Sequence, residues 1–101
     1  MIVVMSSIRV SAGDSDALAD QYRSRSRIAE DQPGCLGIEI LRDTDAPDHF
    51  VVYSRWRNRD AYDAYRRSSA YRLAHARIAE IPGGIRIDPA TRDVSVFEVL
   101  S

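Results

Sequence analysis

The chain has 101 residues, of which 45% are hydrophobic and 29% are charged, and its formal net charge at pH 7 is −1. That length is typical of one folded unit, so we expect residues 1–101 to form a single domain with a modest core. A net charge this close to zero provides no overall field to attract nucleic acid or an anionic membrane, so neither is an expected partner.

The cysteine count and the apolar runs indicate the compartment. Cys35 is the only cysteine, which excludes an intramolecular disulfide and a cysteine cluster for metal. The apolar start, residues 1–5, is short for a signal peptide and lacks a basic beginning. No apolar run reaches membrane-spanning length. We therefore expect a soluble, cytoplasmic protein.

The first part of the chain predicts a strand followed by a helix. Residues 1–10 are rich in β-branched and apolar side chains, which is typical of a strand. Asp14 or Ser15 is the expected N-cap of the helix. Apolar residues recur near the helical period from Asp16 to about Asp31, and the Pro33-Gly34 pair ends the helix.

Two alternating segments follow, and both predict strands. Leu36, Ile38 and Ile40 alternate with other residues over 36–41, and a polar loop over 43–48 separates this segment from the next. Apolar and polar residues alternate again over 50–56. A strand–loop–strand unit is therefore expected, ending at the only tryptophan of the chain.

The rest of the chain predicts a divided helix and a last strand. Asn58 is the expected cap of the second helix, and Ser68-Ser69 is expected to divide it, with the second part over about 70–81. A short extended piece over 85–88 and a final strand over 93–100 complete the pattern.

The predicted order βαββαβ is that of an α+β, ferredoxin-like fold, an antiparallel sheet with two helices on one face. Helices then cover only one face, whereas several strands are apolar on both. An exposed sheet face of that kind marks an interface. We therefore expect a homodimer in which two sheets pack face to face into a dimeric α+β barrel.

Five short motifs lie between Pro33 and His75: Pro33-Gly34-Cys35-Leu36-Gly37, Phe50-Val51-Val52 leading to Trp56, Ala61-Tyr62, Ser69-Ala70-Tyr71 and Ala74-His75. Together they resemble the antibiotic biosynthesis monooxygenase (ABM) family of dimeric α+β barrels, and the resemblance covers nearly the whole chain. It implies oxidation of aromatic polyketide-like intermediates with dioxygen, often without metal or flavin, or the binding and degradation of haem.

His75 is the residue to which the haem-degrading branch gives the sharpest role. A histidine at this place on the second helix is the axial iron ligand of that branch, and neutral imidazole suits haem iron. Helical spacing places His75 on one face with Tyr71 and Ile78, where it could point into an apolar pocket. A structural or surface histidine is the alternative.

The branch's other two site residues differ in this chain. Its asparagine near the end of the first strand falls at Ser6 or Ser7, and its tryptophan, ten residues before the histidine, falls at Tyr65. A serine cannot extend an amide toward ligand-bound oxygen, and a tyrosine brings a hydroxyl in place of an indole.

The polyketide-oxidising branch implies a different use of the aromatic residues. A phenolic substrate held there needs apolar walls and hydrogen-bond donors for its anion. We assign His75, Tyr65 and Tyr71 as candidate catalytic residues and the following as candidate substrate-binding residues: Tyr53, Trp56, Tyr62, Ser6 and Ser7. The alternative is an ordinary aromatic core.

Three functions follow from the resemblance. The first is an oxygen-dependent monooxygenase of small aromatic or polycyclic substrates that needs no cofactor. The second is a haem-binding or haem-degrading protein with His75 as axial ligand, the only metal ligand expected. The third is a non-catalytic dimer that binds a small hydrophobic or aromatic ligand. His49, at a loop edge, is expected to be exposed.

Overall fold

The computed structural model describes residues 1–79 and 87–101. The sheet strands are β1 (Ile2–Val10), β2 (Cys35–Arg42), β3 (His49–Trp56) and β4 (Ile87–Glu98). The helices are α1 (Ser15–Arg23), α2 (Arg59–Arg66) and α3 (Ser69–Ala79), with short 3₁₀ turns η1 (Ala12–Asp14) and η2 (Ile28–Asp31).

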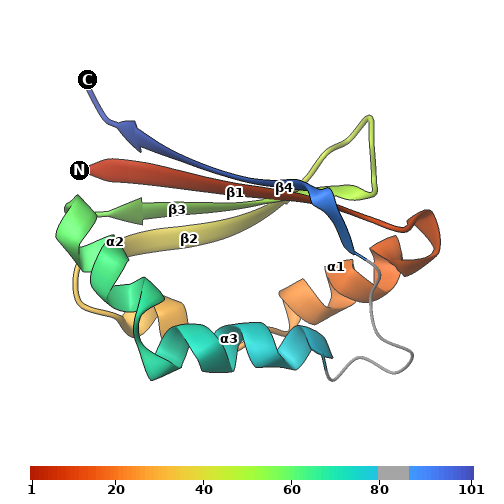
Figure 1. Ribbon diagram of the computed structural model, residues 1–101, viewed down its shortest axis with the longest axis horizontal. Coiled ribbons are helices and arrows are strands. Elements are labelled where there is room, and N and C mark those ends of the chain that lie inside the picture. The colour runs from red at the N-terminus through yellow and green to blue at the C-terminus, as the bar shows by residue number, and fades with distance from the viewer. Residues whose placement is uncertain (80–86) are drawn as a thin grey trace.

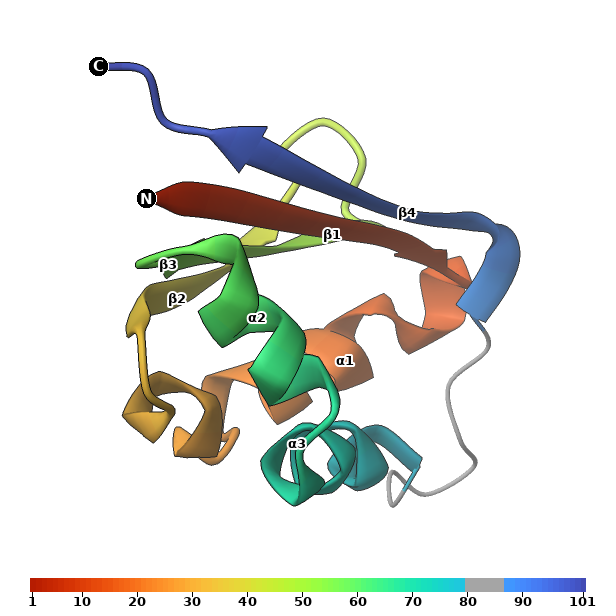
Figure 2. The ribbon, with the colours of Figure 1, turned by 60° about the vertical axis from the view of Figure 1, so that its left-hand side comes forward.

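The four strands form one antiparallel sheet in the order β2-β3-β1-β4. All three helices lie on one face of this sheet, and the other face is uncovered (Figure 1). In the turned view α3 lies farthest from the sheet, beside α1 and α2 (Figure 2). The predicted α+β, ferredoxin-like fold is confirmed. No helix within the described residues is long and apolar enough to span a membrane.

Strand register determines which side chains lie on each face. Residues opposite each other in an antiparallel pair share a face, and successive residues alternate. Val4 lies opposite Ser54 and Val96, and both Val4 and Ser54 are buried beneath the helices. Val3 lies opposite Phe97, and Met5 lies opposite Tyr53, on the uncovered face. We call these two sides the helix face and the outer face.

Two clusters of buried side chains fill the space between the sheet and the helices. One surrounds Trp56, which has no exposed surface, and consists of Val4, Ala29, Trp56, Tyr62 and Tyr65. The other anchors α1 and consists of Val10, Leu18, Ala19 and Phe50. The functional side chains described below extend from the first cluster.

The predicted helix over 16–31 is too long. α1 ends at Arg23, where the Ser24 hydroxyl donates to the Asp20 carbonyl oxygen at 3.1 Å. Serine side chains compete in this way with the helical hydrogen bonds. The chain then re-forms only the short turn η2, in which Ala29 is buried.

The last strand is also longer than predicted. β4 runs from Ile87 to Glu98 as one element, so the extended piece over 85–88 and the strand over 93–100 are not separate within the described residues. Its pairing with β1 shifts register between Ser7 and Arg9.

The predicted division of the second helix is confirmed. The Ser68 hydroxyl donates to the Tyr65 carbonyl oxygen at 2.6 Å and accepts from the Tyr71 amide at 3.2 Å, so it serves the end of α2 and the start of α3. Asn58 caps α2, because its Oδ1 accepts the Ala61 amide at 2.9 Å. α3 is described as far as Ala79, so the predicted helix end at about residue 81 lies outside the described residues.

Candidate functional site

Four aromatic rings form a continuous line from the core to the surface. Trp56 stacks on Tyr65 with ring centroids 5.1 Å apart, and Tyr65 meets Tyr71 edge-on at 5.4 Å. Tyr71 lies against His75 with centroids 4.0 Å apart. Trp56 is fully buried, whereas His75 is exposed. We call these four residues the aromatic line.

The residues of the aromatic line come from β3, α2 and α3, and their spacing along these elements brings the rings together. Trp56 ends β3 on the helix face, and its indole N–H donates to the Ser54 hydroxyl at 3.0 Å. Tyr62 and Tyr65 are three residues apart on the inner side of α2, and both contact Trp56. The break at Ser68 then redirects the chain, so that Tyr71 and His75 stack one turn apart on α3.

A backbone hydrogen bond orients the His75 imidazole. Its Nδ1 lies 2.8 Å from the Tyr71 carbonyl oxygen. A carbonyl oxygen can only accept, so Nδ1 carries a hydrogen, and the neutral form of this imidazole has its lone pair on Nε2. Metal-binding histidines are commonly held by a hydrogen bond of this kind, with the other nitrogen left to bind metal.

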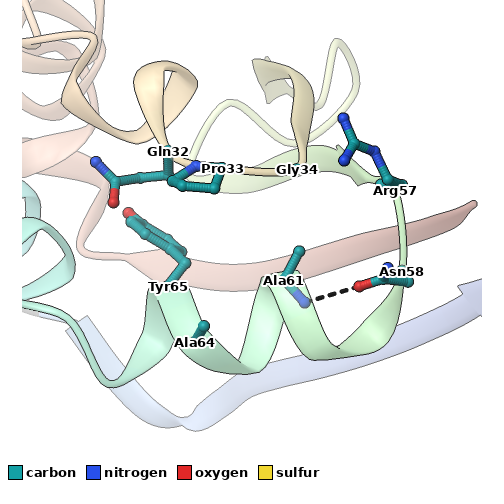
Figure 3. A pocket seen from close by; sticks show the side chains of 8 residues that line it. All are labelled: Gln32, Pro33, Gly34, Arg57, Asn58, Ala61, Ala64 and Tyr65. Carbon is teal, nitrogen blue, oxygen red and sulfur yellow. Dashed lines mark hydrogen bonds between the residues drawn. The ribbon is translucent and has the colours of Figure 1, made fainter.

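A cavity of about 230 Å³ lies beside the inner end of the aromatic line. Its walls come from the 32–34 loop, the end of β3 and α2, and are formed by Gln32, Pro33, Gly34, Arg57, Asn58, Ala61, Ala64 and Tyr65. The hydroxyl end of Tyr65 is directed toward Gln32, and the Arg57 side chain extends on the far side of Gly34 (Figure 3).

Tyr65 presents a protonated hydroxyl to this cavity. Burial, and after it the neighbouring Tyr71, raises the pKa of Tyr65 to about 12. The hydroxyl therefore stays neutral at physiological pH and can donate a hydrogen bond. It suits stabilisation of a ligand anion and does not suit the role of a general base.

The structure brings some of the predicted site residues together and separates others. Trp56, Tyr62, Tyr65, Tyr71 and His75 are contiguous. Ser6 lies on the helix face, opposite Val52 and Val94. Tyr53 and Ser7 lie on the outer face, so the sheet separates them from the aromatic line.

His49 is not exposed as the sequence suggested. Its side chain is 24% exposed, and its two ring nitrogens lie 2.7 Å from the Ser7 hydroxyl and 3.1 Å from Asp43 Oδ2. The Asp43 amide also donates to the His49 carbonyl oxygen at 3.0 Å, closing the loop between β2 and β3. The placement of both residues at the ends of one hairpin loop was the sequence signal that could have revealed the contact.

No group of three or more histidine, cysteine, aspartate or glutamate side chains that could hold a metal ion is present among the described residues. Cys35 is half-buried, and burial raises the pKa of its thiol. A partly buried thiol with a raised pKa is a poor nucleophile.

The sheet order, the helices on one face and the aromatic line together define an α+β, ferredoxin-like protein with a histidine-terminated site. The profile of the antibiotic biosynthesis monooxygenase family matches residues 1–77, and the chain belongs to that family. The resemblance found in the sequence is therefore confirmed.

Characterised relatives include enzymes of haem degradation. The heme oxygenase (mycobilin-producing) of Mycobacterium tuberculosis is 28% identical over 97 residues, covering 96% of this chain and 85% of the relative. The heme-degrading monooxygenase of Bacillus thuringiensis is 26% identical over 84 residues, covering 81% and 78%. A solved structure of an MhuD mutant with two manganese protoporphyrin IX molecules bound per active site is 25% identical, with a TM-score of 0.75 and coverage of 100% and 96%.

His75 suits haem iron as a ligand, but the cavity beside Tyr65 does not suit the porphyrin. The free Nε2 of the exposed His75 suits an iron ligand. The cavity beside Tyr65 lies below the roughly 300–1,000 Å³ typical of ligand pockets and cannot enclose a porphyrin. A haem bound by this chain would therefore lie at the exposed end of the aromatic line and not in that cavity.

Proposed function

We propose that this protein is a monooxygenase that takes haem as its substrate and holds it through His75. The observation that carries the proposal is the backbone hydrogen bond to His75 Nδ1, which leaves Nε2 directed away from its own helix backbone. Two relatives of 28% and 26% identity that act on haem support it. Haem iron would activate dioxygen when bound, and the protein's part is to bind and orient.

In this proposal Tyr71 and Tyr65 hold the His75 imidazole in place and do not contact the haem iron. Tyr71 supports the imidazole twice, through its carbonyl oxygen and through the ring 4.0 Å away. Tyr65 supports Tyr71 from the core side. Because the inner rings are buried, the direction of the imidazole is set by packing and does not depend on the ligand.

Titration with hemin, followed by absorbance, tests the proposal. We expect a saturable Soret band at one haem per subunit that His75→Ala abolishes. His49→Ala removes the only other histidine and should keep the band. If His75→Ala retains the band and its affinity, the proposal is wrong. If haem binds through His75, a reductant is added next. Oxygen consumption and loss of the Soret band would then indicate degradation, and an unchanged band would indicate binding alone.

A second candidate function is oxidation of a small aromatic substrate without a cofactor. The observation that favours it is the cavity of about 230 Å³ with the protonated Tyr65 hydroxyl in its wall. A neutral donor in a partly apolar cavity stabilises a phenolate, and a phenolate can pass an electron to dioxygen. Phenol-dependent oxygen uptake that Tyr65→Phe reduces would support it. Ligand binding without oxygen uptake would instead support a non-catalytic binding protein.

We also propose that the protein is a homodimer joined through the outer faces of two sheets. The apolar part of that face contains Val3, Met5, Leu41, Val51, Tyr53 and Phe97, of which Leu41 and Phe97 are 41% and 49% exposed. Light scattering after size-exclusion chromatography should give twice the 11.4 kDa chain mass. Phe97→Asp, which buries a charge in the interface, should give a monomer, and an unchanged mass would contradict this arrangement.

A further inference from the structure

The cavity beside Tyr65 has polar groups at both ends. Gln32 and the Tyr65 hydroxyl lie at one end, and Arg57 and Asn58 lie at the other (Figure 3). The remaining lining residues are small or apolar: Pro33, Gly34, Ala61 and Ala64. Ligand pockets are commonly built in this way, with largely apolar walls and a few polar groups that orient the ligand. The arrangement suits a ligand with an apolar body and a polar group at each end.

The cavity is open on the helix side of the sheet. The 32–34 loop and α2, which form most of its walls, lie on that side (Figure 1). Arg57, Asn58 and Ala64 are exposed there. Packing of two sheets through their outer faces, as in the proposed homodimer, therefore leaves the cavity accessible.

One end of the cavity offers a free donor and a free acceptor. Tyr65 is only 9% exposed, and its hydroxyl makes no hydrogen bond within the described residues. Gln32 Nε2 donates to the Ile28 carbonyl oxygen at 3.1 Å, which leaves Gln32 Oε1 free to accept. The hydroxyl of Tyr65 is directed toward Gln32 (Figure 3). A ligand hydroxyl both donates and accepts, so it satisfies both groups at once.

The other end of the cavity suits a carboxylate. Arg57 is the only charged residue among the described residues that line the cavity, and its guanidinium forms no ion pair with any of the described residues. Its backbone amide donates to the Gly34 carbonyl oxygen at 2.8 Å, which holds the residue at the cavity wall. Asn58 Oδ1 accepts the Ala61 amide, so the Asn58 side-chain N–H groups remain available. Guanidinium and amide donors together favour a planar carboxylate.

The size of the cavity limits the body of the ligand. Its volume of about 230 Å³ is below that of most ligand pockets, so the apolar part is limited to about one ring. Gly34, Ala61 and Ala64 keep this space open, because longer side chains at these positions would fill it.

We propose that the cavity binds a small aromatic hydroxycarboxylate, with the carboxylate at Arg57 and the hydroxyl between Tyr65 and Gln32. The inference rests on the cavity of the second candidate function and names a ligand class for it, but it requires neither oxidation nor haem. The unpaired guanidinium attracts the anion, and a neutral phenol of the same size lacks that contact.

Isothermal titration calorimetry with three probes tests each end separately. We expect saturable binding of para-hydroxybenzoate at one ligand per chain. Arg57→Gln should weaken para-hydroxybenzoate about 10-fold or more, the range for a hydrogen bond to a charged group, and leave para-hydroxybenzamide unchanged. Tyr65→Phe should weaken para-hydroxybenzoate about 2–10-fold and leave benzoate unchanged. A general loss of structure would weaken all three probes alike.

Two further variants test the position of the site. Ala64→Leu adds bulk to the cavity from an exposed position on α2 and should abolish binding of all three probes. Arg59→Gln is the matched control, because Arg59 is also an exposed arginine but pairs with Asp63 at 3.3 Å and does not line the cavity. It should bind para-hydroxybenzoate as the wild type does. Thermal unfolding of each variant checks that the fold is retained.

Three results would overturn the proposal: no saturable binding of para-hydroxybenzoate, equal weakening of the acid and the amide by Arg57→Gln, or full binding by folded Ala64→Leu. The proposal and the second candidate function fail separately. Binding of the acid without oxygen uptake would support this ligand class and contradict oxidation. Oxygen uptake with neutral phenols that Arg57→Gln leaves unchanged would support oxidation and contradict this ligand class.

Discussion

Gly34 occupies a position where an added methyl group should be costly. Its φ is +82°, in the left-handed region that disfavours residues with a Cβ, and a Cβ built there would lie 2.5 Å from Ala61 Cβ. The Gly34 carbonyl oxygen also accepts the Arg57 amide at 2.8 Å, so the loop cannot move away freely. This residue joins the 32–34 loop to α2 at the wall of the cavity.

The cost of Gly34→Ala can be assembled from two contributions. The left-handed conformation costs an alanine about 1–2 kcal/mol. Forcing a methyl group into a packed contact costs about 1–3 kcal/mol. The lower entropy of the unfolded chain offsets about 0.4–1 kcal/mol. The net loss in the free energy of unfolding is then about 3 kcal/mol, with a fall in Tm of roughly 12–24 °C for a domain of this size.

Chemical denaturation of four variants tests this reasoning. Gly13→Ala is the matched control, because nothing lies within 4 Å of a Cβ built there and its φ is not positive. It should change stability by less than about 1 kcal/mol. Ala61→Gly, alone and combined with Gly34→Ala, completes a double-mutant cycle. We expect the pair to couple by about 1–3 kcal/mol, the contact contribution. Equal effects of the two glycine substitutions, or an additive cycle, would refute the geometric argument.

Three further predictions concern single interactions. Asn58→Ala removes the cap on the Ala61 amide and should cost about 0.5–2 kcal/mol in urea denaturation. Trp56→Ala empties a fully buried site and should cost about 3–5 kcal/mol; a loss below about 1 kcal/mol would contradict the packing described. Partial burial opposes the Glu30 carboxylate, but hydrogen bonds and charge from Arg25, and then from Arg27, hold its pKa below the usual range. Because the folded pKa is lowered, this stabilisation is present above the unfolded pKa of about 4.3 and disappears as pH falls through the folded value. Glu30→Gln should therefore be less stable than wild type at pH 7, with the difference vanishing in strongly acidic urea melts.

The sheet could be predicted from the sequence because its signals are local. Alternation over 36–41 and 50–56 reports a two-residue period directly, and Asn58 and Ser68 act on backbone groups within three residues. The end of α1 was missed for the opposite reason. Apolar residues at 28–29 continue the helical period, yet they pack from a separate turn that Glu30 ties to Arg25.

For the candidate site, too, local spacing could be predicted from the sequence and strand register could not. Tyr65, Tyr71 and His75 are near neighbours on two consecutive helices, so spacing and family resemblance find them together. Ser7 was assigned to the same site only because an asparagine of the haem-degrading branch falls at Ser6 or Ser7. Which of two adjacent strand residues faces the helices depends on the register, and a shift by one residue reverses the face. The pairing of Ser7 with Val51 settles its place on the outer face.

The two histidines lie on opposite faces of the sheet and differ in the hydrogen-bond partners of their ring nitrogens. On the helix face, the Tyr71 ring and carbonyl oxygen orient the His75 imidazole through Nδ1 and leave Nε2 available, an arrangement suited to binding a metal-centred ligand. On the outer face, both ring nitrogens of His49 are occupied, because Nδ1 lies 3.1 Å from Asp43 Oδ2 and Nε2 lies 2.7 Å from the Ser7 hydroxyl oxygen. The partner of Nδ1, a carbonyl oxygen for His75 and a carboxylate for His49, is an acceptor in both cases. What differs is the group at Nε2, so we predict that hemin binding depends on His75 and does not depend on His49.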